Sequence, residues 1–325
     1  MVRGFSSETN NSHEKDNDNV YVVAAAAYTF TFTACNSAEE PVIAQPDGQT
    51  APMTRAATIE NFARHLIVEV NDVNILNAGE YYLSNGEPFF THVVIYSSNI
   101  RGDANGNVYA YNNPNNAAIL ADPDKYIKPL QAKGIKVLLG YLGDHTGAGF
   151  ANLTNQQAES FCNQIIEVGE AAGVDGYFLD DEWSEYGTRG WPPANSTSFS
   201  NVILKLRNKT DKIITLLDWG NTNTLSPEAV ACIDLTHQGS LNGYYLSSMF
   251  PVSHYLPFSI DLRGPLSDSA VKVRTIQSMR ANAGGIGIYD LRMEPTRLST
   301  FNAVAWAFDL TCTHTGVTYP KDYGN

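Results

Sequence analysis

Basic residues and cysteines are scarce in this chain of 325 residues. Lys and Arg number 21 against 34 Asp and Glu, so the formal net charge is −13. This balance argues against nucleic-acid binding and leaves no basic patch for anionic lipids. The four cysteines form no CxxC pair and no zinc-type spacing: Cys35, Cys162, Cys232 and Cys312. We expect Cys162 to be a small buried hydrophobe, and a disulfide between Cys232 and Cys312 is possible.

The chain also lacks an apolar run long enough to span a bilayer comfortably. Residues 20–34, VYVVAAAAYTFTFTA, have the length of a signal-peptide core. They end in Phe-Thr-Ala before Cys35, which resembles a bacterial lipoprotein cleavage box, although acidic residues precede the run. We therefore expect residues 1–35 to be a leader with a lipid anchor at Cys35, and the protein to be exported to the cell surface or outer membrane, or secreted. Residues 36–57 contain three prolines and no apolar pattern, which is typical of a linker.

From residue 58 onward, short apolar runs alternate with helical patterns at 122–134, 154–173, 198–210 and 268–285. The runs number eight, as in a closed (β/α)8 barrel. They are residues 65–70, 92–97, 136–142, 176–181, 212–219, 243–250, 255–260 and 285–291. The pattern predicts a single α/β domain over residues 58–325, a TIM-type barrel, which we expect to be a monomer. An open doubly wound sheet is the alternative, but no GxGxxG motif or P-loop supports it.

A cluster of acidic residues ends the fourth run, in the sequence DGYFLDDE at 175–182. Because side chains alternate along a strand, Asp180 and Glu182 share one face and Asp181 points away. Two neighbouring carboxyl groups resist ionising together, so one is expected to keep its proton near neutral pH. Such a pair suits acid-assisted cleavage of a glycosidic bond. A metal site or a solvated rim is the alternative, but no further acidic or histidine cluster completes a metal shell, and we expect no metal or cofactor.

Barrel active sites lie at the carboxyl ends of the strands, and polar and aromatic residues gather at this end of several runs. Trp183 directly follows the acidic pair and is expected to stack on a sugar face or to exclude water. The other candidate substrate contacts at this rim are Asn71, Asn99, His145, Trp219 and Tyr289.

Residues 174–187 also resemble the DGxxxDxE signature of glycoside hydrolase family 18, which holds chitinases and endo-β-N-acetylglucosaminidases. The acidic triplet with the following aromatic residue and EYG is similar to the endoglycosidase H and F type, as are residues 69–77, 112–143 and 140–154. The resemblance implies that Glu182 is the acid/base and that Asp180 orients the substrate's 2-acetamido group. The acetamido oxygen then attacks the anomeric carbon, without a covalent bond to the enzyme. Asp175 matches the first acid of the signature; we include it among the substrate contacts, although support of the strand is its more natural role.

Two departures from the family pattern bear on the function. Phe178 stands where many chitinases have an acid, which favours the endoglycosidases. The sixth run ends in Ser-Ser-Met-Phe at 247–250 and lacks the family's tyrosine, for which Tyr244 or Tyr245 is a candidate replacement. We expect an enzyme that cuts between the two core N-acetylglucosamines of an N-linked glycan or glycoprotein, of high-mannose or hybrid type. A chitinase and a non-catalytic glycan-binding barrel are the alternatives.

Overall fold

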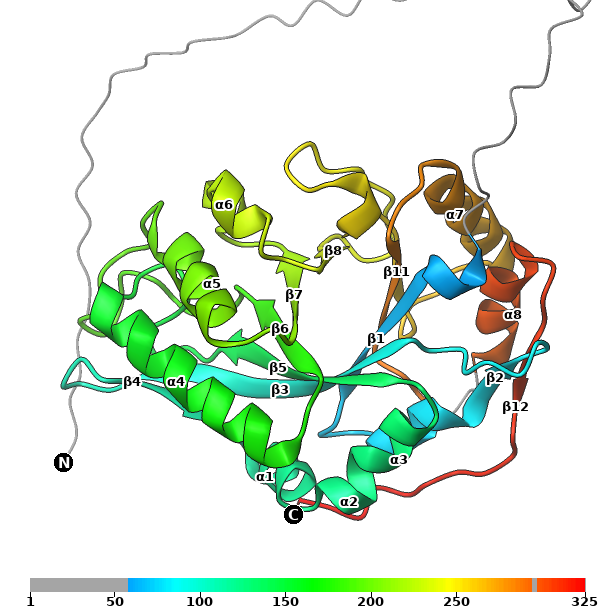
Figure 1. Cartoon of the computed structure of the whole chain (residues 1–325), viewed down its shortest axis with the longest axis horizontal. Helices are drawn as coiled ribbons and strands as arrows, with labels where there is room; N and C mark the ends of the chain where they lie inside the picture. Colours follow the sequence, from blue (N-terminus) through cyan, green and yellow to red (C-terminus); the bar gives the residue numbers. More distant parts are fainter. Residues whose placement is uncertain (1–57, 294–296, 325) are drawn as a thin grey trace, which may run out of the picture. The chain divides into compact units, whose positions relative to one another are not determined.

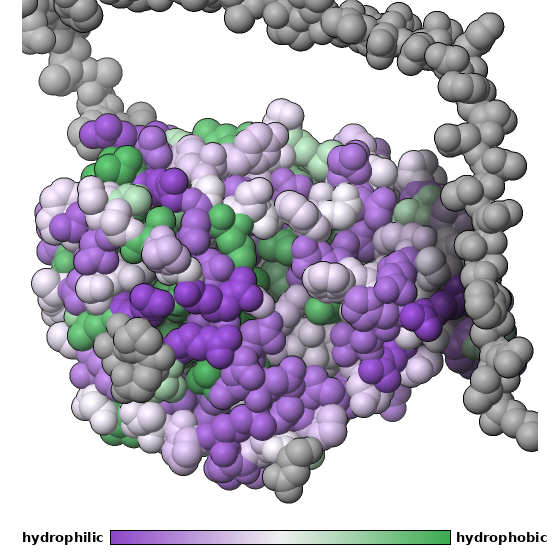
Figure 2. All heavy atoms as spheres, turned by 180° about the vertical axis from the view of Figure 1, so that it is seen from behind, coloured by the Kyte–Doolittle hydropathy of each residue, from purple (hydrophilic) through white to green (hydrophobic). Residues whose placement is uncertain are grey.

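The computed structural model describes residues 58–293 and 297–324. The expected leader with Cys35 and the expected linker lie outside these residues. Within them, no helix is both long enough and apolar enough to cross a membrane. Hydrophilic residues predominate on the face of the molecule shown in Figure 2, where apolar residues form small patches.

A ring of parallel strands forms the centre of the fold (Figure 1). Hydrogen bonding runs in the order β10-β11-β1-β3-β5-β6-β7-β8-β9. The short strands β9 and β10 belong to one extended segment, which pairs with β8 through β9 and with β11 through β10, so it closes the ring. Counted as one strand, it completes the eight of the predicted (β/α)8 barrel. The bounds are β1 (Ala63–Glu69), β3 (His92–Gly102), β5 (Lys136–Gly143), β6 (Gly176–Asp180), β7 (Ile213–Asp218), β8 (Leu235–Gln238), β9 (Tyr255–Leu256), β10 (Ser259–Asp261) and β11 (Gly285–Tyr289).

The sixth predicted strand is wrong. Residues 243–250 contribute only an isolated bridge between Tyr244 and Phe258, and the sixth strand of the ring is β8 instead. Its four residues, LTHQ, include the polar residues Thr236, His237 and Gln238, all of which are buried. A short, polar strand gives no apolar signal in a sequence. Residues 247–250 are not the end of the sixth strand, so their lack of a tyrosine does not show whether the family's strand-six tyrosine is present.

Helices surround the ring, and their ends follow local sequence signals. In α4 (Asn155–Ala172), Thr154 and Gln157 form a reciprocal capping box, and Gly173 ends the helix in the left-handed region at φ 69°. The predicted helix at 122–134 is divided into α2 (Pro123–Tyr126) and α3 (Lys128–Ala132), because Pro129 has no amide hydrogen with which to continue the first helix. The others are α1 (Pro114–Ala121), α5 (Ser198–Lys209), α6 (Pro227–Val230), α7 (Asp268–Arg280) and α8 (Leu298–Trp306).

Two antiparallel additions flank the barrel. Strand β4 (Val108–Tyr111) pairs with the end of β3, and β2 (Tyr81–Leu83) pairs with β12 (Cys312–His314). Among the described residues Cys162, Cys232 and Cys312 are free thiols, so the disulfide considered between Cys232 and Cys312 is not formed. Cys162 is buried, as expected.

Strand alternation divides the apolar residues into two cores. In β1, Leu66 and Val68 pack outward into the large core between the strands and the helices, whereas Ile67 points into the barrel. The inner core fills the barrel and is made of Ile67, Val94, Tyr96, Leu138, Phe178 and Leu217. This core fills the interior, and in barrels of this kind the sites lie at the carboxyl ends of the strands.

Candidate active site

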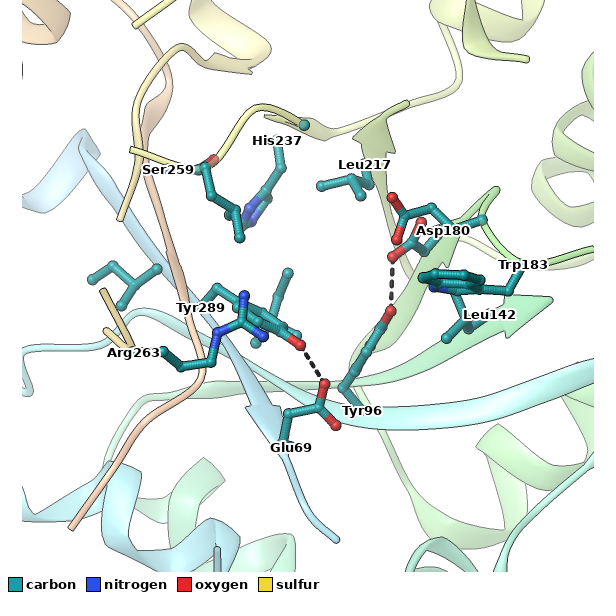
Figure 3. A pocket seen from close by; sticks show the side chains of 15 residues that line it. Glu69, Tyr96, Leu142, Asp180, Trp183, Leu217, His237, Ser259, Arg263 and Tyr289 are labelled. Carbon is teal, nitrogen blue, oxygen red and sulfur yellow. Dashed lines mark hydrogen bonds between the residues drawn. The ribbon is translucent and has the colours of Figure 1, made fainter. Parts of the chain in front are cut away.

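A cavity of about 280 Å³ opens at the carboxyl ends of the strands. Its apolar lining comes from Ile67, Leu142, Leu217 and Ile288, and Figure 3 shows polar side chains on several sides of it. Both Asp180 and Glu182 line the cavity, and Asp181 does not. The predicted alternation along β6 is therefore confirmed. The volume is at the small end of ligand pockets, which run from about 300 to 1,000 Å³, and suits one sugar residue better than an oligosaccharide.

Asp180 is the most deeply placed acid of the cavity. The Tyr96 hydroxyl donates a hydrogen bond of 2.8 Å to its Oδ2, while its buried Oδ1 accepts none from the described residues. Burial, and then the nearby Glu182 carboxylate, raises the pKa of Asp180 well above its usual range, although the bond from Tyr96 opposes this shift. The site thus holds a buried acceptor with no donor among the residues that the structure describes.

Glu182 follows β6 directly and is half-buried. Burial, and then the Asp181 carboxylate, raises its pKa as well. Two interacting acids with raised pKa values titrate as a pair, so one proton is retained between them at a pH where isolated carboxyl groups are ionised. Both shifts have the direction that a proton-holding carboxyl requires, and which of the two acids holds the proton stays a prediction from the sequence.

Asp181 fixes the loop that carries Glu182. It accepts a hydrogen bond from the Tyr186 hydroxyl, and the backbone and side-chain nitrogens of Asn221 donate to it at 2.9 and 2.8 Å. The loop after β6 is thereby joined to the loop after β7. Asp181 does not line the cavity, and it affects the site only by holding these two loops together.

One residue of the cavity lining, and two residues of neighbouring loops that do not line it, have an unusual backbone conformation. Trp183 lines the cavity at φ 58° with 60% of its surface exposed. His145 and Asp290 also have φ values in the left-handed region, at 52° and 64°. Non-glycine residues are uncommon there, and such strain is concentrated at functional sites. An exposed, strained tryptophan beside the acidic pair fits a stacking surface for a sugar ring.

The other sequence candidates lie at different distances from the cavity. Tyr289 lines it, and Trp219 lines an adjoining hollow that shares Gly239 with it. His145 is an exposed rim residue 2.8 Å from Glu185, and its ring centroid lies 5.5 Å from that of Trp183.

Neither predicted asparagine reaches the cavity. Asn71 accepts a hydrogen bond of 2.7 Å from Asn115, and Asn99 faces the carbonyls of Leu142 and Gly143 at 3.4 Å. Both asparagines therefore belong to the packing of the rim.

The assignment of Asp175 to the substrate contacts is wrong. This residue precedes β6 and lies at the amino end of the strand, away from the cavity. Its carboxylate accepts hydrogen bonds of 2.9 Å from the Val137 amide and the Gln131 side chain, and it pairs with Lys136 at 3.3 Å. Asp175 thus joins β6 to β5, which is the strand-supporting role.

Five polar residues of the site were not predicted from the sequence: Glu69, Tyr96, His237, Ser259 and Arg263. For Glu69 and Tyr96 a signal existed, because each occupies an inward position near the end of a correctly predicted run. Ser259 also lay in a predicted run but carried no distinguishing motif. His237 lies in the missed strand β8, and Arg263 lies in a loop after β10. Among the described residues no group of three or more His, Cys, Asp or Glu is arranged to hold a metal ion.

Two of the curated relatives match this chain at similar identity. The chain is 35% identical over 230 residues to an endo-β-N-acetylglucosaminidase of Flavobacterium sp. (strain SK1022), covering 68% of this chain and 72% of the relative. The chain belongs to the endo-β-N-acetylglucosaminidases of glycoside hydrolase family 18. It is also 36% identical over 194 residues to endo-β-N-acetylglucosaminidase F1 of Elizabethkingia meningoseptica, covering 57% of this chain and 56% of the relative. No protein-family model matches the chain.

Solved structures place this endo-β-N-acetylglucosaminidase among barrels of the same fold. The crystal structure of EndoBT-3987 from Bacteroides thetaiotamicron with a Man5GlcNAc product has a TM-score of 0.67 at 24% identity, covering 82% of this chain and 66% of that chain. The family 18 chitinase ChiB of Flavobacterium johnsoniae has a TM-score of 0.51 at 12% identity, covering 76% of this chain and 94% of that chain. At these identities the likeness concerns the fold alone.

Proposed function

We propose that this chain hydrolyses the β-1,4 bond between the two core N-acetylglucosamines of N-linked glycans. The observation that carries the proposal is the buried Oδ1 of Asp180, unpartnered among the described residues, beside Glu182, whose pKa burial raises, in a cavity sized for one sugar. The family membership supports the same reaction. EndoBT-3987, which shares the fold, was solved with a Man9GlcNAc2Asn substrate as well as with a Man5GlcNAc product.

The reaction begins with the acetamido group of the sugar in the cavity. Asp180 Oδ1 accepts the acetamido N–H, which holds the acetamido oxygen beneath the anomeric carbon and stabilises the charge that develops there. Glu182 donates its proton to the leaving oxygen while the acetamido oxygen forms the new bond, which gives an oxazolinium intermediate. Glu182, now ionised, takes a proton from water as the water opens this ring. The configuration at the anomeric carbon is retained because two displacements occur.

A chitinase would use the same two acids on a homopolymer, so the surroundings of the cavity must decide between the substrates. The segments after β3 and β5, residues 103–107 and 144–149, are rich in Asp, Asn, Gly and His, and such residues satisfy the many hydroxyls of a branched mannose cap. The exposed Trp183 and Trp219 are the aromatic surfaces that would favour a chitin chain. We favour high-mannose or hybrid N-glycans on the polar composition of these loops.

Digestion of a high-mannose glycoprotein tests the proposal against both alternatives. Mass spectrometry of the protein is expected to find one N-acetylglucosamine left on each cleaved asparagine, with chitin oligomers cleaved far more slowly. Cleavage of chitin oligomers alone would make the protein a chitinase. Binding of the glycoprotein without cleavage of either substrate would make it a glycan-binding barrel.

A further inference from the structure

The cavity has a second polar wall, on the side away from the acidic pair. In the ring of eight strands β11 is four strands from β6 in either direction, so Tyr289 stands across the barrel from Asp180. Figure 3 shows Tyr289 and Arg263 on one side of the cavity, Asp180 and Trp183 on the other, and Glu69 joined to Tyr289 by a hydrogen bond. Nothing in the mechanism above uses Glu69, Tyr289 or Arg263.

The hydrogen bonding of Glu69 leaves part of its carboxylate open. The Tyr289 hydroxyl donates to Oε1, and within the described residues no other side chain or amide donates to this carboxylate. Glu69 is half-buried at the end of β1 and lines the cavity. Its Oε2 is therefore an acceptor held in place by the bond to Oε1.

Arg263 completes this wall without neutralising Glu69 directly. Its guanidinium lies over the Tyr289 ring at 4.7 Å from the centroid, and it bonds to Asp261 at 3.0 and 3.1 Å. The carboxylate, the phenol and the guanidinium together present an acceptor and donors to the same cavity. A carboxylate beside a cation is a strong acceptor for sugar hydroxyls, which are costly to bury unpaired.

The size of the cavity indicates which sugar hydroxyls reach the wall formed by Glu69, Tyr289 and Arg263. About 280 Å³ suits one sugar residue, so both walls contact the same ring. The anomeric carbon of that ring lies at Glu182, and the opposite wall therefore meets its far end, where the 3- and 6-hydroxyls of a 4-linked N-acetylglucosamine are free.

We propose that Glu69, fixed by Tyr289 and flanked by Arg263, binds a free 3- or 6-hydroxyl of the reacting N-acetylglucosamine and so determines which sugar the cavity accepts. The inference rests on the proposed function for the identity of that sugar. Glu69 is here a specificity-determining contact; it takes no part in proton transfer.

Deoxy substrates test the contact directly. We would measure kcat and KM for a glycopeptide core and for its 3-deoxy and 6-deoxy versions at the reacting sugar, with the wild type, Glu69→Ala and the control Glu167→Gln, an exposed residue of α4. With the wild type, one deoxy substrate should have a kcat/KM about 10- to 100-fold below that of the natural substrate, which is the usual contribution of a hydrogen bond to a charged group. With Glu69→Ala, the same deoxy substrate and the natural substrate should have nearly equal kcat/KM. With the natural substrate Glu69→Ala should raise KM far more than it changes kcat, and the acid limb of the profile should move to lower pH, because the Glu69 carboxylate adds to burial in raising the pKa of Asp180. Losses from both deoxy substrates that are the same in the wild type and in Glu69→Ala would overturn the inference.

A binding measurement separates this inference from the proposed function. Calorimetry would measure how the Glu182→Gln variant binds a mannose-capped glycan that ends in one N-acetylglucosamine, which requires no turnover. Adding Glu69→Ala to this variant should weaken binding about tenfold or more. An unchanged dissociation constant would refute the role of Glu69 even if the wild type cleaves glycoproteins. Failure of the wild type to cleave, with binding weakened as expected, would refute the proposed reaction and leave the contact standing.

Discussion

At the scale of single residues, the site depends on where each acid finds its partners. The three consecutive acids have different surroundings. Asp180 faces the cavity with one oxygen that has no partner among the described residues, Asp181 holds the loop, and burial raises the pKa of Glu182, the acid of the proposed reaction. The alternation of a strand was enough to predict the two faces. It could not predict Tyr96 as the donor to Asp180, because that contact joins β6 to a strand more than 80 positions earlier in the chain.

Replacing Glu182 by Gln should remove nearly all turnover and leave the fold intact. The amide keeps the shape of the side chain but has no acidic proton, and general acid catalysis is typically worth about 10²–10⁴-fold. Turnover of a glycopeptide and circular dichroism of both proteins are the measurements. Retention of more than about a tenth of the wild-type rate would remove Glu182 from the role of acid.

Replacing Tyr96 by Phe should move the acid limb of the kcat/KM profile to higher pH. The hydrogen bond from Tyr96 lowers the pKa of Asp180, which burial otherwise raises. Without this bond the pKa of Asp180 rises further, and the ionised form needed to orient the acetamido group is reached only at higher pH. Tyr82→Phe, a change in the peripheral strand β2, is the control. An acid limb that stays in place or moves to lower pH would contradict this account of Asp180.

At the scale of elements, the sequence was most informative where strands are apolar and least where they are polar. Seven of the eight predicted runs overlap strands of the ring, since their inward and outward residues are both apolar. Strand β8 was missed because burial of Thr236, His237 and Gln238 depends on partners from other strands. His237, for example, is 2.7 Å from His65 of β1. Asp175 was misplaced for a different reason: its match to the family signature outweighed its position ahead of β6, at the amino end of the strand.

The contact between β8 and β11 predicts a strict requirement for glycine at position 287. A Cβ there would lie 2.4 Å from Nδ1 of His237 and 2.8 Å from Oγ of Ser259. Gly287→Ala should therefore lower the free energy of unfolding by about 1–3 kcal/mol, as overpacking of a core does. Gly264→Ala, where a Cβ would have its nearest neighbour at 3.4 Å, is the matched control. Equal denaturation midpoints for the two variants would show that β8 and β11 are less closely packed than described.

At the scale of the whole molecule, the barrel interior combines an apolar core with buried histidines, and its carboxyl end is polar. His237, which lines the cavity, is 2.7 Å from His65, and the rings of His65 and His92 are stacked with centroids 5.4 Å apart. Burial lowers the pKa of His237 to about 3 and that of His92 to about 4. Export and lipidation at Cys35 stay predictions from the sequence, outside the part of the chain that the structure describes.

These histidines predict how the stability of the barrel depends on pH. Their pKa values in the folded state lie below the ordinary value near 6.5, so the unfolded chain binds more protons once the pH falls below 6.5. Their contribution is complete above pH 6.5 and is lost as the pH falls toward the folded values, by up to about 1.4 kcal/mol per pH unit for each histidine. Denaturant unfolding of the wild type and of His92→Gln should show a shallower loss for the variant between pH 6.5 and about 4. Identical slopes would mean that His92 is not held neutral by the fold.

The central claim is that the barrel cuts between the two core N-acetylglucosamines with help from the substrate's own acetamido group. Proton NMR of a single high-mannose glycopeptide during digestion observes both the bond that is cut and the configuration of the first product. We expect the β-anomer of a glycan ending in one N-acetylglucosamine to form first and then to mutarotate, with the other N-acetylglucosamine still on the peptide. Initial release of the α-anomer, or of a glycan that carries both core sugars, would contradict the claim.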